Sequence, residues 1–134
     1  MFCAPDGVFL RCWGSKGDGN VQFRSPTGVA VANGEVFVTD WGRCNVSVFR
    51  ASDGAFLRKW GSEGSGEGHF KGPLGVAVDG GLVYVADSGN GRVQVFEACD
   101  GRFVRQWAVA GATGLAIGGG VLLVTGCEYV SCFH

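Results

Sequence analysis

The sequence has few histidines, little proline and almost no excess of charge. Only 2 histidines and 3 prolines occur among its 134 residues, and 11 Lys and Arg against 12 Asp and Glu leave a net charge of −1. So small a charge gives no broad attraction to a phosphate backbone or to an anionic membrane. No apolar run is long enough to cross a bilayer, and the first residues lack the pattern of a signal peptide. We therefore expect a cytoplasmic protein with no membrane association.

Metal-ligand motifs are missing as well. The 6 cysteines form no C-x-x-C pair, and together with only 2 histidines they make a zinc site a poor fit. We expect no metal and no cofactor. The cysteines are expected to be free thiols, most of them buried as small hydrophobic groups.

Glycine is abundant, with 25 residues, and the chain repeats itself. Three tryptophans, Trp13, Trp60 and Trp107, are spaced 47 residues apart, and three Asp-Gly dipeptides keep the same spacing. Chance does not produce such a pattern, which divides the chain into repeat units. The units cover about 7–53, 54–100 and 101–134.

Each unit contains four short runs rich in Val, Phe and Leu. In the middle unit they cover 75–79, 82–87, 93–97 and 102–107. Their length and their separation by turn residues predict β-strands, and no sustained apolar period predicts a helix. The Asn-Gly, Gly-Gly and Asp-Gly dipeptides between them are typical of two-residue hairpins, in which both residues take positive φ. Four antiparallel strands per unit predict an all-β protein made of propeller blades.

The segment Pro73–Phe96, P-L-G-V-A-V-D…V-Y-V-A-D-S-G-N-G-R-V-Q-V-F, resembles the NHL repeat almost letter for letter. The first unit is similar, although Asn45 stands where the second has Arg92, and the third is degenerate, with Gly126 in place of the aspartate. The resemblance covers nearly all of the chain but only three repeats. It implies a β-propeller, commonly six-bladed, similar to the propeller region of tripartite-motif NHL proteins.

The order of the strands predicts an open segment of such a ring. The chain begins with an outermost strand at 8–13, continues through two full blades and ends with three inner strands. We expect one propeller segment over 1–134 with three four-stranded antiparallel blades, the strand at 8–13 closing the last. Three blades are too few for a ring, since propellers have about four to eight. Two alternatives stay open: a homodimer that completes a six-bladed ring, or a fragment of a longer propeller.

The long loops gather at one end of the blades, where function usually lies on a rigid scaffold. The candidate binding residues of this face are Trp41, Arg43, His69, Lys71, Asn90 and Arg24. Trp41 is the sharpest candidate because Ser88 takes its place in the next blade, and a Trp beside an Arg is typical of protein-interface anchors. The alternative is that Trp41 packs between the blades.

Asp87 and Arg92 bracket the loop S-G-N-G. A carboxylate five residues before a guanidinium favours a structural pair that stabilises the loop, as in the family's own pattern. His69 is expected to be solvated or locally hydrogen-bonded. No nucleophile with a positioned base can be assembled from the loops, so we expect no catalytic residues and no enzyme.

These observations favour a non-catalytic binding module, most simply a protein–protein interaction scaffold that uses the loop-rich face. One alternative is a propeller that binds single-stranded RNA, which is less favoured because the face mixes basic and acidic side chains and has few aromatic residues for stacking. The resemblance also leaves open a partial propeller of an enzyme such as a peptide-amidating lyase, or a substrate-recognition domain of a ubiquitin ligase.

Overall fold

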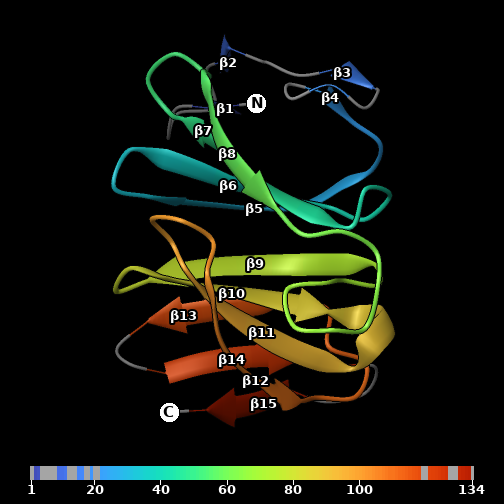
Figure 1. The fold of residues 1–134 in the computed structure, drawn as a ribbon. Coiled ribbons are helices and arrows are strands. Elements are labelled where there is room, and N and C mark those ends of the chain that lie inside the picture. Colours follow the sequence, from blue (N-terminus) through green and yellow to red (C-terminus); the bar gives the residue numbers. More distant parts are fainter. Residues whose placement is uncertain are drawn as a thin grey trace.

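The structure is a computed structural model that describes residues 2–3, 9–11, 15–16, 19, 22–118, 121–126 and 130–133. Apart from one turn of 3₁₀-helix, η1 (Ser88–Asn90), its regular elements are β-strands. The sheets are stacked one after another along the molecule, in the order of the chain (Figure 1). The repeat marks Asp6-Gly7 and Trp13 lie outside the described residues.

The middle of the chain forms two four-stranded antiparallel blades. The first contains β5 (Pro26–Ala32), β6 (Glu35–Asp40), β7 (Asn45–Arg50) and β8 (Phe56–Trp60). The second contains β9 (Pro73–Asp79), β10 (Leu82–Asp87), β11 (Arg92–Glu97) and β12 (Phe103–Ala108). In both blades each strand pairs with the next strand of the chain. The strands predicted for the middle unit are therefore confirmed, to within one or two residues at their ends.

The last unit forms a three-stranded sheet of β13 (Leu115–Gly118), β14 (Val121–Thr125) and β15 (Val130–Phe133). The strand expected to close it at 8–13 is described only at β2 (Phe9–Arg11), which pairs with β1 (Phe2–Cys3). These two strands lie at the opposite end of the stack from β15 (Figure 1).

The expectation of three four-stranded blades is thereby corrected to two blades and a smaller sheet. The physical reason is that an open stack holds its first strand far from its last sheet. A short parallel pair, β3 (Ser15–Lys16) and β4 (Gln22–Phe23), also lies beside the first blade (Figure 1).

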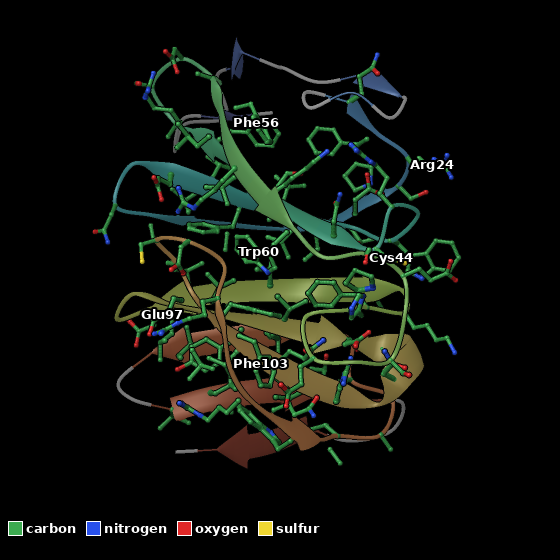
Figure 2. The ribbon with its side chains drawn as sticks, viewed as in Figure 1. Arg24, Cys44, Phe56, Trp60, Glu97 and Phe103 are labelled. Atoms are coloured by element: carbon green, nitrogen blue, oxygen red, sulfur yellow. The ribbon has the colours of Figure 1, made fainter. Side chains whose placement is uncertain are left out.

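Two apolar layers join the three sheets. In the layer between the blades, Phe37 and Val48 of the first blade lie in one buried cluster with Val76, Val85 and Phe96 of the second. Figure 2 shows Trp60 directed from β8 toward the second blade, where its ring centre lies 5.6 Å from that of Phe96. A second cluster joins the other face of the second blade to β14. The second blade is thus covered on both faces.

The innermost strands of neighbouring sheets approach so closely that only glycine fits at the contact. A Cβ atom on Gly28 would lie 2.4 Å from the carbonyl oxygen of Leu74, and one on Gly75 would lie 2.6 Å from that of Thr113. The Gly75 N–H donates to this Thr113 oxygen at 2.7 Å. The small first residue of G-V-A-V is therefore a requirement of the junction between blades.

The hairpin turns follow two designs. Both residues of Asn33-Gly34 and both of Gly80-Gly81 have positive φ, as predicted for two-residue turns. The prediction is wrong for the Asp-Gly turn, where Gly54 has positive φ and Asp53 does not. The carboxylate of Asp53 instead accepts a hydrogen bond from the N–H of Ala55 at 3.0 Å, and this bond lowers the pKa of Asp53.

We predict that Gly75→Ala lowers the free energy of unfolding by about 2 kcal/mol or more, because the added methyl group meets only backbone atoms, which cannot move aside cheaply. The matched control is Gly66→Ala, where a Cβ atom would meet only the ring of His69. The control should change stability by no more than about 0.5 kcal/mol. Urea unfolding followed by tryptophan fluorescence measures both. Equal losses would contradict a junction that requires glycine.

Candidate functional site

A buried aspartate ends the second strand of the first blade and organises the loops above it. Asp40 is 1% exposed. Its carboxylate accepts hydrogen bonds from the backbone N–H groups of Arg24 at 2.8 Å, Ser25 at 2.9 Å, Gly42 at 3.1 Å and Arg43 at 3.2 Å. Two of these donors belong to the loop that enters β5 and two to the loop after β6. One carboxylate therefore fixes both loops.

Asp87 does the same work in the second blade with more side-chain partners. It is fully buried and accepts from the backbone N–H of Lys71 at 2.7 Å. Its other oxygen accepts from Arg92 Nε at 2.8 Å, Asn90 Nδ2 at 2.9 Å and Gln94 Nε2 at 3.2 Å. Asp87 and Arg92 thus form a buried ion pair that is also fully hydrogen-bonded, the arrangement in which buried charges are tolerated.

The guanidinium of Arg92 holds the long loop that precedes β9. Nη1 donates to the carbonyl oxygen of Ser65 at 3.0 Å and to Gln106 Oε1 at 2.7 Å. Nη2 donates to the carbonyl oxygens of Gly66 at 2.9 Å and His69 at 2.8 Å. With the bond from Nε to the aspartate, all five donors of the guanidinium have acceptors.

In the first blade Arg43 holds the loop that precedes β5, although it is not the sequence counterpart of Arg92. Its Nη1 donates to the carbonyl oxygens of Gly19 at 3.0 Å and Gln22 at 2.8 Å. These two residues lie 47 positions before the two whose carbonyls bind Nη2 of Arg92. Asn45, the counterpart of Arg92 in sequence, is buried and its Oδ1 has no hydrogen-bond partner. The arginine has moved two residues along the chain while keeping its carbonyl acceptors.

Trp41 lies in the loop after β6 and is 53% exposed. It borders an open groove of ≈ 490 Å³ between the two blades. The groove is lined by Trp41, Gly42, Cys44, Glu63, Lys71, Gly72, Ser88 and Gly89. The indole leans across to the second blade, since a Cβ atom on Gly72 would lie 2.5 Å from Trp41 Nε1. Trp41 therefore packs against the second blade with one side and leaves about half of its surface exposed to solvent.

The six candidate residues divide into three groups. Trp41 and Lys71 line the groove, and the side chain of Lys71 is exposed. The side chains of Arg43 and Asn90 belong to the loop framework, since Asn90 also donates to the carbonyl oxygen of Gly64 at 2.9 Å. The remaining two, Arg24 and His69, are exposed and lie outside the lining.

His69 makes a local hydrogen bond, with Nδ1 lying 2.9 Å from Ser62 Oγ. Sequence analysis did not single out Glu63 or Gly72 as groove residues. The contact between Trp41 and Gly72 could not be predicted from sequence, because it depends on how the two blades are placed in space.

Among the described residues, no three His, Cys, Asp or Glu side chains come together in a group that could hold a metal ion. Cys44 is a buried free thiol and Cys99 an exposed one. The side chains of Cys3, Cys12, Cys127 and Cys132 lie outside the described residues. The described residues also include no helix long and apolar enough to span a membrane.

A family model for the NHL repeat matches residues 23–49 and 70–96. The chain carries two NHL repeats. Each matched range begins at a phenylalanine three residues before the first strand of its blade, Phe23 or Phe70, and ends in the third strand. The NHL repeats therefore contain both buried aspartates and every groove-lining residue except Glu63, which lies between the two matched ranges.

Solved structures with a similar fold include other propeller proteins. A putative exported protein from Bacteroides fragilis matches with a TM-score of 0.70 and 19% identity, over 87% of this chain and 36% of that one. A luciferin-regenerating enzyme matches with a TM-score of 0.59 and 18% identity, over 79% and 38%. BamB from Moraxella catarrhalis matches with a TM-score of 0.62 and 16% identity, over 78% and 29%.

These identities show the fold alone, and the chain matches at most 38% of the length of these structures. A search of curated proteins finds no match.

We predict that Arg43→Ala lowers the free energy of unfolding by about 2 kcal/mol, because two carbonyl groups lose a charged donor. Adding Asn45→Arg to that variant should restore most of the loss, since it recreates the second blade's pairing of an arginine with a buried aspartate. The matched control, Asn45→Lys on the same background, supplies the charge without the planar fork and should restore little. Urea unfolding measures the three variants, and equal stability of the Arg and Lys rescues would contradict the shifted-arginine account.

Proposed function

We propose that this chain is a non-catalytic binding module that captures a protein partner in the groove beside Trp41. The observation that carries the proposal is an indole that is 53% exposed at the mouth of a groove between two fixed blades. Tryptophan is among the residues most enriched at the energetic centres of protein interfaces. Its indole N–H donates to no group in the part of the chain that the structure describes, which leaves it for a partner.

The surrounding loops support the proposal because they are already ordered. Asp40 and Asp87 fix the loops on both sides of the groove through backbone and side-chain hydrogen bonds. A partner therefore meets a surface whose conformational entropy has been lost on folding, and binding costs less. This is the advantage of a site built on a rigid scaffold.

The charges of the groove favour a protein partner over a nucleic acid. Glu63 and Lys71 both line the groove, so the lining carries both signs of charge. Single-stranded nucleic acids are bound by positive grooves with several aromatic side chains for stacking. Trp41 is the groove's only aromatic lining residue among the described residues. The mixed charges and the single indole of the groove suit a partner protein whose exposed loop or tail inserts an apolar side chain beside Trp41.

Selection from a displayed library of random peptides on the immobilised chain tests this site. We predict that Trp41→Ser, which copies the second blade's Ser88, weakens the selected peptides by about 30-fold or more, as measured by calorimetry. Arg102→Ala, an exposed change in a hairpin turn of the second blade, should leave their affinity unchanged. The urea midpoint of Trp41→Ser should stay close to that of the unaltered chain.

Peptides that bind both forms equally would refute the site. Binding of a single-stranded oligonucleotide that is lost in Trp41→Ser, with no peptide selected, would refute the protein partner and support the RNA alternative.

A further inference from the structure

The large apolar side chains left exposed in the described residues are Val29, Val31, Trp41 and Leu123. Trp41 belongs to the groove. The other three lie on the outer faces of the end sheets, Val29 and Val31 on β5 and Leu123 on β14. β5 belongs to the first blade and β14 to the last sheet, which lie toward opposite ends of the stack (Figure 1). Each end therefore presents an apolar surface to solvent.

The exposed face of β5 has a buried counterpart inside the molecule. Val29 and Val31, 63% and 57% exposed, correspond through the 47-residue repeat to Val76 and Val78 of β9. Val76 is 6% exposed and Val78 packs beside it in the cluster between the two blades. On β5 the first blade thus offers to solvent the same side chains with which β9 docks onto it. The counterparts on β6 and β7, Val36 and Phe49, are buried, and Phe49 packs against Phe23.

Leu123 of the last sheet corresponds to a first-blade residue that contacts the second blade. The loops of the third unit are shorter, so its G-L-A-I-G segment aligns with G-V-A-V-D of the second unit at an offset of 39 residues. This alignment makes Leu123 the counterpart of Tyr84. Tyr84 in turn corresponds to Phe37 of the first unit through the 47-residue repeat. Phe37 is 1% exposed and lies in the same cluster as Val76. In the last sheet, the residue at the position that contacts the following blade is therefore Leu123, and it is 42% exposed.

Two threonines of the first and of the last unit provide a second set of equivalent positions, and in the first blade they form hydrogen bonds to the next blade. In the first blade, Thr39 Oγ1 donates to the Leu74 carbonyl oxygen at 2.6 Å and Thr27 Oγ1 donates to that of Pro73 at 2.9 Å. These bonds join the first blade to the second.

Their counterparts in the last sheet are Thr113 and Thr125, whose hydroxyl oxygens lie 3.0 Å apart. Within the described residues these two hydroxyl groups bond only to groups of their own sheet. The corresponding acceptors at the other end of the stack are the carbonyls of Pro26 and Thr27, both in exposed residues of β5.

We propose that the two end faces are complementary and that two copies of this chain join through them, head to tail, in a closed ring of six blade units. The last sheet lacks an outer strand among the described residues, and β2 (Phe9–Arg11) has the F-L-R sequence with which the outer strand β8 begins. Since β2 lies at the first-blade end (Figure 1), the ring would bring it next to β15 of the other copy.

The area available for a dimer is limited by the last sheet, which has three strands. Three strands cover roughly 250 Å² at the usual strand spacing and length. A ring of two copies buries at most four such areas, or about 1,000 Å², which is the low end of specific interfaces. Identical junctions that close after two copies also prevent open-ended assembly.

Light scattering of the purified chain over micromolar to millimolar concentrations tests the ring. We expect a mass twice the 14.0 kDa of the chain. Leu123→Glu and Val31→Lys each place a charge in both junctions and should raise the dimer Kd by more than about a hundredfold. Both positions are exposed in the single chain, so their circular dichroism spectra should remain those of a β-sheet protein.

Trp41→Ser is the matched control, since it removes an exposed large apolar side chain outside the junctions, and it should keep the dimer mass. A mass of 14.0 kDa throughout would overturn the proposal and assign the end faces to blades of a longer chain. A mass that grows without limit would overturn the closed ring. Loss of the dimer in Trp41→Ser would place the contact on the loop face instead, and so distinguishes this proposal from the binding site.

Discussion

A blade of this chain has two apolar faces and can bury neither of them by itself. The second blade shows the consequence most clearly: Val76 and Val85 pack toward the first blade, while Ala86 and Val93 pack toward the last sheet. Stacking is therefore the source of stability, as in other repeat proteins, in which each unit contacts only its neighbours. The glycine at each inner contact follows from the same constraint, since the close approach of the strands brings a carbonyl oxygen where a Cβ atom would lie.

The loop face is a product of this stacking. Packing fixes the ends of β6 and β10, and the aspartate at each end is buried where backbone N–H groups of the incoming loop can reach it. Each of these carboxylates accepts four hydrogen bonds, all from backbone N–H groups at Asp40 and one from a backbone N–H and three from side chains at Asp87. Such a carboxylate is a strong local organiser, because each bond is charge-assisted and shielded from water. The groove beside Trp41 is then a gap between two rigid edges. The proposed binding function depends on this order of events, in which the surface is prepared before a partner arrives.

Much of the fold and part of the loop framework could be predicted from sequence, because equivalent positions of the repeat units can be compared within the one chain. Val- and Phe-rich runs between turn residues locate the strands, and the spacing of Asp87 and Arg92 indicates their pairing. The role of Arg43 could not be predicted, since only the folded loop brings its guanidinium to the carbonyls of Gly19 and Gln22. The pairing of β2 was also missed, because strand order along the chain does not say whether the first and last sheets meet.

Amide hydrogen exchange of the loop residues tests the central claim most directly, that buried carboxylates hold the binding face in one conformation. The informative amides are those of Ser25 and Lys71, which lie in exposed residues but donate to Asp40 and Asp87. The account predicts that they exchange as slowly as the amide of Val85 in the centre of β10, since they open only when the blade does. Exchange at the rate of an unstructured loop would show that the face is not prearranged, and would contradict the account.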